Sequence, residues 1–121
     1  MSRLLLDTHA LIWIVRNDAA LSKSAIDAFE TSEEIFCSVA SFWEIAIKRG
    51  KDPKSFPLPE NWLELLTGEI RLNGMSLLGV GLSHCEAVER LPPHHKDPFD
   101  RMLIAQARTE KLIILTKDPY F

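Results

Sequence analysis

The sequence has few cysteines and no long apolar run. Only Cys37 and Cys85 occur, without CxxC spacing, so neither a disulfide framework nor a standard zinc motif is predicted. We expect both thiols to be free core side chains in a reducing cytoplasm. The longest apolar stretch, residues 10–15, is far shorter than the ~20 residues of a membrane span, and the acid at Asp7 comes too early for a signal peptide. We therefore expect no membrane association.

An excess of positive charge is also absent. Fourteen basic side chains against seventeen acidic ones give a formal net charge of −3. This balance argues against a protein that coats nucleic acid through bulk positive charge. It leaves open a protein that approaches nucleic acid through bound metal ions.

The composition and the order of segments predict one α/β domain over residues 1–121. Hydrophobic residues make up 46% of the chain and charged residues 26%, as in ordinary globular domains. Strand-like and helix-like segments alternate, which favours a small, mostly parallel sheet flanked by helices. Strands are expected at 3–6, 35–37, 75–80 and 112–115, and helices at 8–15, 22–29, 39–48, 60–66, 83–91 and 98–110.

Local signals predict where several helices begin and end. Ser22 is a candidate cap for the helix that runs to about Phe29, and Ser38 for the helix at 39–48, which Gly50 would close. The S-x-x-E spacing of Ser83 and Glu86 predicts a capping box. Three prolines within residues 51–59 predict a loop.

Four acids are placed where they could meet. Asp7 follows the first strand and Asp118 the last, and the carboxyl ends of parallel strands share one edge of a sheet. Glu44 lies in the second turn of the helix at 39–48, and Asp100 in the first turn of the helix at 98–110. Helices that cross over a parallel sheet begin at the same edge. The four carboxylates could therefore converge.

Such a cluster predicts a divalent metal ion. Adjacent carboxylates repel one another unless they are protonated or neutralised, and their hard oxygen atoms suit Mg²⁺ or Mn²⁺. A metal held in this way can orient a water, lower its pKa and stabilise the charge on a phosphate. The chemistry fits metal-dependent hydrolysis of a phosphodiester.

Each acid also has a plainer structural interpretation. Asp7 could cap the helix that follows it, and Glu44 could form an i,i+4 ion pair with Lys48. Asp118 precedes Pro119, a common turn.

Either Asp97 or Asp100 could be the helix cap or the ligand. Because proline follows Asp97, we assign Asp97 to capping and Asp100 to chemistry.

Four segments of the chain, taken together, resemble the PIN-domain ribonucleases and, among them, the VapC-type toxins. The segments are LLDTHALIW at 5–13, SVASFWEIAIK at 38–48, HKDPFDRMLIAQA at 95–107 and TKD at 116–118. The resemblance implies a Mg²⁺- or Mn²⁺-dependent ribonuclease that cuts RNA, is held inactive by a cognate antitoxin, and forms a homodimer.

The resemblance also implies roles for single residues. Asp7 and Asp100 would bind the metal directly, Asp118 directly or through water, and Glu44 would orient water or act as an outer ligand. Thr116 and Ser41 would support the acids by hydrogen bonds. Such domains usually continue beyond the T-x-D segment into a further strand, so we expect that C-terminal strand to be absent from this sequence.

Other chemistry-bearing residues receive structural interpretations. The set His84, Cys85, His94 and His95 matches no standard zinc pattern. His9 is expected to begin a helix rather than act as a base. The tryptophans at 13, 43 and 62 are expected in the core or a dimer interface, with Trp43 on the apolar stripe of its helix.

Basic side chains near the acids could contact RNA phosphates. A basic run of this kind, here at residues 48, 49, 51 and 54, marks a solvated helix end more often than a phosphate contact. Arg101 is the better candidate for a phosphate contact, although it could instead pair with an acid of the site.

Three rival functions compete with the ribonuclease. An aspartyl phosphatase usually carries a second acid two residues after its nucleophile, where this chain has His9. A receiver-like domain needs an acid after a central strand, and residues 77–82 contain none. A catalytically inactive PIN-like protein-binding module is the remaining alternative, and the presence of all four acids favours the nuclease.

Overall fold

Four parallel strands form the centre of the fold. The computed structural model describes residues 2–16, 23–93 and 96–116. The strands are β1 (Arg3–Leu6), β2 (Glu34–Ser38), β3 (Ser76–Leu78) and β4 (Ile113–Leu115). They pair in the order β3-β2-β1-β4, all parallel, which confirms the predicted small parallel sheet.

Helices connect the strands, as parallel crossovers require. In the described part of the chain they are α1 (Thr8–Arg16), α2 (Lys23–Thr31), α3 (Val39–Lys51), α4 (Trp62–Leu72), α5 (Leu82–Glu89) and α6 (Pro98–Glu110). Across the described ranges, no helix combines the length and apolar character that crossing a membrane needs.

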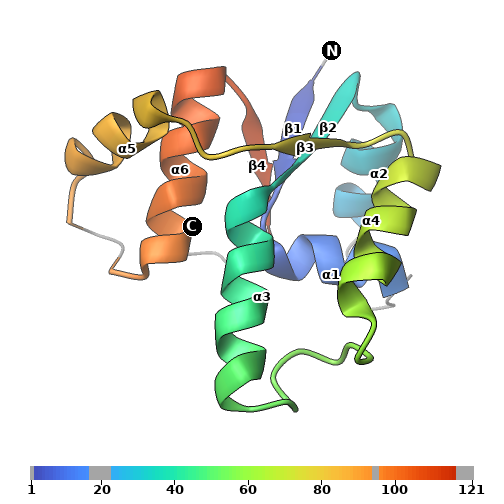
Figure 1. Cartoon of the computed structure of the whole chain (residues 1–121). Helices are drawn as coiled ribbons and strands as arrows, with labels where there is room; N and C mark the ends of the chain where they lie inside the picture. The colour runs from blue at the N-terminus through green and yellow to red at the C-terminus, as the bar shows by residue number, and fades with distance from the viewer. Residues whose placement is uncertain (1, 17–22, 94–95, 117–121) are drawn as a thin grey trace.

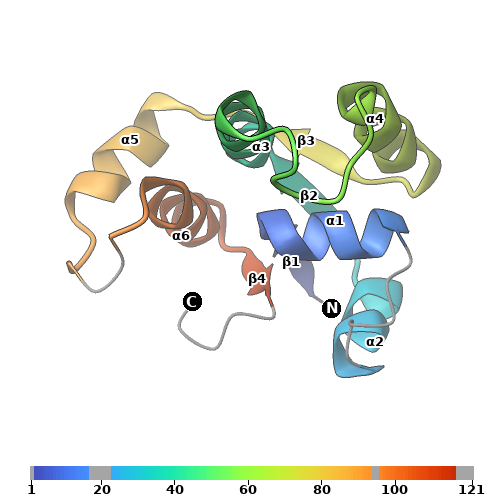
Figure 2. The same ribbon diagram turned by 90° about the horizontal axis from the view of Figure 1, so that it is seen from below.

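The sheet separates two hydrophobic clusters, because neighbouring side chains of a strand point to opposite faces. Leu5 packs with Leu103 and Ala107 of α6, whereas Leu6 belongs to the cluster with Leu11 and other residues of α1, α3 and α4. Figures 1 and 2 accordingly show α5 and α6 on one side of the sheet and α2 and α4 on the other. Helices α1 and α3 leave the carboxyl ends of the central strands β1 and β2, so they bring their first turns to one edge.

Several predicted boundaries were wrong. Helix α3 continues through Gly50 and ends at Lys51. Its C-cap is Asp52, whose N–H donates to the Lys48 carbonyl. Helix α4 extends to Leu72 rather than ending at Leu66, and β3 is shorter than residues 75–80. Ser22, the expected cap of the second helix, lies outside the described residues.

The predicted capping box of Ser83 and Glu86 was also wrong. Gly81 is the N-cap of α5, and its N–H donates to Nδ1 of His84 at 2.9 Å. The histidine ring therefore takes the position that the sequence pattern gave to a glutamate.

Cys85, which was expected in the core, and Trp43, which was expected in the core or a dimer interface, are both exposed. Cys85 lies at the surface, whereas Cys37 is fully buried and both thiols are free. The side chain of Trp43 is 61% exposed. It lies edge-on to Phe99 of α6, with 5.2 Å between the ring centroids, because the buried face of α3 passes through Ser41, Glu44 and Ile45 instead.

Candidate active site

Asp7 occupies the junction between β1 and α1. Its N–H donates to the carbonyl of Leu115 at 3.1 Å, which holds it at the carboxyl ends of β1 and β4. Its Oδ1 accepts the N–H of Ala10 at 2.7 Å, so the predicted cap is present. Its Oδ2 accepts the hydroxyl of Thr116. Both carboxylate oxygens therefore have a fixed partner.

The surroundings of Asp7 raise the pKa of its carboxyl group. Burial is the main cause, and the nearby charge of Glu44 acts in the same direction. The hydrogen bonds from Thr116 and Ala10 and the charge of His9 favour the ionised form but do not outweigh burial. A buried acid whose ionisation is disfavoured has a physical reason to bind a cation.

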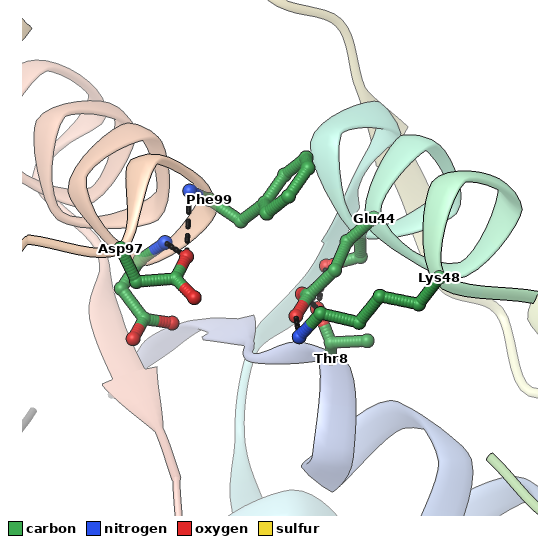
Figure 3. Close-up of polar contacts among 7 residues, drawn as sticks. Thr8, Glu44, Lys48, Asp97 and Phe99 are labelled. Carbon is green, nitrogen blue, oxygen red and sulfur yellow. Dashed lines mark hydrogen bonds and ion pairs between the residues drawn. The ribbon is translucent and has the colours of Figure 1, made fainter. Parts of the chain in front are cut away.

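Glu44 is held from both sides. It is 5% exposed; its Oε1 accepts the hydroxyl of Thr8 at 2.6 Å, and its Oε2 accepts Nζ of Lys48 at 2.5 Å. The Thr8 hydroxyl also shares a 3.0 Å hydrogen bond with the hydroxyl of Ser41. The predicted i,i+4 ion pair is thus present, and it is one half of a clamp on this carboxylate (Figure 3).

The ammonium group of Lys48 faces several carboxylates. Burial acts to lower the pKa of Lys48, but the hydrogen bond and charge of Glu44, together with the charges of Asp97 and Asp100, raise it above its ordinary value. Lys48 therefore carries a firmly held positive charge beside the acids.

Asp97 and Asp100 approach from α6. Oδ1 of Asp97 accepts the N–H groups of Phe99 at 2.8 Å and Asp100 at 3.1 Å, which confirms Asp97 as the N-cap with Pro98 after it. Asp100 lies in the first turn of the same helix. Figure 3 shows Asp97 across a gap from Glu44 and Lys48 of α3.

These side chains surround one small pocket at the carboxyl edge of the sheet. It has a volume of about 110 Å³ and is lined by Asp7, Thr8, His9, Glu44, Lys48, Asp97 and Asp100. We call it the acidic pocket. The structure thus brings together three of the four acids predicted for the site. Asp118, the fourth, lies outside the described residues.

The donor atoms of the acidic pocket fit Mg²⁺ or Mn²⁺ in kind. Carboxylate oxygens are the ligands these ions prefer, and Mg²⁺ usually takes only one or two of them and keeps several waters. Within the described ranges, no three His, Cys, Asp or Glu side chains stand close enough together to enclose an ion. A metal bound here would therefore keep open positions.

The chain is similar to known proteins. The PIN domain family matches residues 4–121. The chain belongs to the PIN-domain family. This PIN domain is 28% identical to "Ribonuclease VapC22" of Mycobacterium tuberculosis (strain ATCC 25618 / H37Rv) over 120 residues, which cover 98% of this chain and 88% of that protein. A solved structure titled "Toxin-antitoxin complex from Klebsiella pneumoniae" shares the fold, with a TM-score of 0.61 and 17% identity over 95% of this chain and 86% of that one.

Sequence reasoning did not assign Thr8, His9, Lys48 or Asp97 to the pocket of this PIN domain. Thr8 follows Asp7 at the end of a strand, and Asp97 precedes Asp100 by less than one helical turn, so proximity along the chain was an available signal. The sequence predicted Lys48 either as an i,i+4 partner of Glu44 or as part of a basic run at a solvated helix end that could contact RNA phosphates. Its position across the pocket from Asp97 depends on how α3 packs against α6, which no local pattern reveals.

His84 and Arg101, which the sequence also singled out, make contacts that hold helices together. His84 is 3% exposed and its Nε2 lies 2.8 Å from Oε2 of Glu110, so the ring links α5 to the end of α6. Arg101 donates to the backbone carbonyls of Val88, Leu91 and Pro92. These contacts hold the end of α5, and the expectation that Arg101 points to RNA is not supported by them. His94 and His95 lie outside the described residues.

Proposed function

We propose that this PIN domain is a metal-dependent endoribonuclease that hydrolyses RNA phosphodiester bonds and acts as the toxin of a toxin–antitoxin pair. One observation carries the proposal. Asp7 at the junction of β1 and α1, Glu44 of α3 and Asp100 of α6 line one pocket at the carboxyl edge of a parallel sheet, where ligands of such sheets bind. The similarity to a protein named as a ribonuclease supports RNA as the substrate.

Asp7 and Asp100 are the proposed metal ligands, with Asp118 as a third. A bound Mg²⁺ or Mn²⁺ ion lowers the pKa of a coordinated water and neutralises charge on the phosphate. The RNA backbone carries one negative charge per phosphate, so it can enter a pocket of carboxylates only when cations compensate them.

Glu44 is proposed to orient and deprotonate the attacking water. Thr8 and Lys48 each hold one of its oxygens, which fixes the direction of the carboxylate. A carboxylate has about four lone-pair sites, so either oxygen can still accept one proton from the water. As the water oxygen bonds to phosphorus, the bond from phosphorus to the leaving ribose oxygen breaks, and that oxygen takes up a proton from solvent. The ammonium of Lys48 remains beside the pocket as a positive charge that a phosphate oxygen can approach.

The proposed partner is a cognate antitoxin chain that covers the acidic pocket. The solved relative described as a toxin–antitoxin complex supports this partner. A homodimer is proposed from the family resemblance alone, and light scattering of the purified protein would test it.

Cleavage of a mixed pool of structured RNAs tests the proposed activity. The purified protein is incubated with Mg²⁺, Mn²⁺ or EDTA beside two matched variants, Asp100→Asn and Asp27→Asn. Asp27 is an exposed residue of α2, so its amide controls for the substitution itself. We expect wild type and Asp27→Asn to cut RNA with either metal but not in EDTA.

Asp100→Asn should lose cleavage, while in EDTA it keeps the melting temperature of wild type. Cutting that persists in EDTA, or in Asp100→Asn, contradicts the proposed mechanism. If folded wild type cuts no RNA and binds none, a protein-binding module without catalysis becomes the better description.

A further inference from the structure

A second and larger pocket adjoins the acidic pocket. Its volume is about 400 Å³, and it is lined by His9, Ile12, Trp13, Lys48, Ser55, Phe56 and Pro57. We call it the aromatic pocket. His9 and Lys48 line both pockets, so the two cavities share a wall. Its volume falls within the range of roughly 300–1,000 Å³ typical of small-molecule sites.

Three rings gather in the aromatic pocket. The His9 ring centroid lies 5.7 Å from that of Trp13 and 5.5 Å from that of Phe56, with both pairs tilted. His9 is exposed, and Trp13 and Phe56 are half-buried. The rings therefore keep accessible surface on which a flat ligand can stack.

The loop that presents Phe56 is firmly held. Phe56 has φ of 60°, a left-handed backbone conformation that is unfavourable for a bulky side chain. Its carbonyl accepts Nη1 of Arg49 at 3.2 Å and the N–H of Leu58 at 2.9 Å. These bonds maintain a conformation that brings the Phe56 ring against His9. Strained residues held in this way are common at ligand sites.

Charge and aromatic surface meet at Lys48. Its Nζ lies 5.7 Å from the centroid of the Phe56 ring and 2.5 Å from Oε2 of Glu44. Among the described residues that line the two pockets, it is the only lysine or arginine. A ligand with a flat ring in the aromatic pocket and an anion at the shared wall would satisfy both features.

We propose that the aromatic pocket binds a nucleobase of single-stranded RNA, with the adjoining phosphate at Lys48 and the acidic pocket. The inference rests on the proposed ribonuclease function and adds the form of its substrate. A base can enter this pocket only when it is unstacked from its neighbours, as in loops and single strands. The hydroxyl of Ser55 and the ring nitrogens of His9 can form hydrogen bonds to the base edge.

Binding of a fluorescein-labelled single-stranded RNA of about ten nucleotides tests this inference independently of cleavage. Anisotropy is measured in the Asp100→Asn background, so that the RNA stays intact. Phe56→Leu and Trp13→Leu keep an apolar side chain and remove the ring, and Phe56→Tyr keeps the ring. Trp43→Leu removes an exposed aromatic side chain of α3 that lines neither pocket.

We expect Phe56→Leu and Trp13→Leu each to raise the Kd roughly 5- to 100-fold, as loss of one base–aromatic stack does. Phe56→Tyr and Trp43→Leu should bind like the background protein. A duplex of the same RNA should bind more weakly than the single strand. Thermal melting of every variant checks that the fold is retained.

Three results would overturn the inference. If wild type cuts RNA while both leucine variants bind it unchanged, the ribonuclease function stands and the pocket belongs to another occupant, such as a protein side chain. If Trp43→Leu weakens binding as much as Phe56→Leu, stacking is not specific to this pocket. If the background protein binds no RNA and wild type cuts none, the proposed function fails and this inference fails with it.

Discussion

The hydroxyl of Thr8 and Oε1 of Glu44 lie 2.6 Å apart, so the first residue of α1 fixes a carboxylate in the second turn of α3. The same hydroxyl contacts Ser41. The contact joins two helices that leave neighbouring strands, and it lies on the wall of the acidic pocket. Packing of α1 against α3 and the direction of Glu44 are therefore coupled.

Substitution of Thr8 tests this coupling. Thr8→Val keeps the shape of the side chain but leaves Oε1 of Glu44 buried without its donor. We expect it to lower the free energy of unfolding by about 1–3 kcal/mol and to reduce RNA cleavage, whereas Thr8→Ser should retain both. Urea denaturation and the cleavage assay measure these effects. Equal stability of Thr8→Val and wild type would show that the bond contributes nothing.

Substitutions should distinguish the roles of the two acids at the start of α6. Asp97→Ala removes the side chain that accepts two N–H groups and should cost about 0.5–2 kcal/mol of stability. Asp97→Asn can still cap the helix, so it should fold and cut RNA like wild type. Asp100→Asn should instead fold normally and lose cleavage. Loss of cleavage in Asp97→Asn with normal stability would give Asp97 a direct role in the reaction.

Metal binding should be visible as a gain in stability. A ligand that binds only the folded state raises the melting temperature, so Mg²⁺ should stabilise wild type relative to EDTA. Asp7→Asn should show no such gain, because its amide is a poor ligand for the ion. In EDTA the variant should be at least as stable as wild type, since a buried carboxylate beside Glu44 is replaced by a neutral group that can cap α1. Melting curves with and without the metal decide the point, and an equal Mg²⁺ effect in both proteins would remove Asp7 from the metal site.

The two cysteines should differ in reactivity. Burial raises the pKa of Cys37 to about 12, and the thiolate is the reactive form. At pH 8 to 9 in the folded protein, we expect iodoacetamide to modify the exposed Cys85 and leave Cys37 unmodified, as mass spectrometry can show. The unfolded thiol has a pKa of about 8.5, so the folded state holds this proton more tightly. The stability that this proton contributes is complete below that value and is lost as the pH rises through about 12. Rapid labelling of Cys37 under native conditions would contradict its burial.

Short-range patterns predicted the elements of this PIN domain well. The Asp97-Pro98 start of α6, the Ser38 cap of α3 and the strand ending at Leu115 are all present. Each depends on residues within about one helical turn or one strand, where the chain itself supplies both partners of the interaction. The alternation of these elements also sufficed to predict a parallel sheet, whose crossovers bring the strand ends and helix starts to one edge.

Interactions between elements distant in the sequence were decided only by the tertiary structure. His84 caps α5 because Glu110 of α6 lies against its other ring nitrogen, and no pattern near Ser83 and Glu86 records that contact. The exposure of Trp43, the clamp of Thr8 and Lys48 on Glu44, and the aromatic pocket around Phe56 likewise follow from how helices and a loop pack together. Asp7, Glu44 and Asp100 could be named from the sequence because strand ends and helix starts carry local signals, and Thr8, Lys48 and Asp97 each lie within four residues of one of them. Their neighbours from other elements could not be named. Those neighbours are set by the packing of side chains from separate elements, which a linear pattern does not encode.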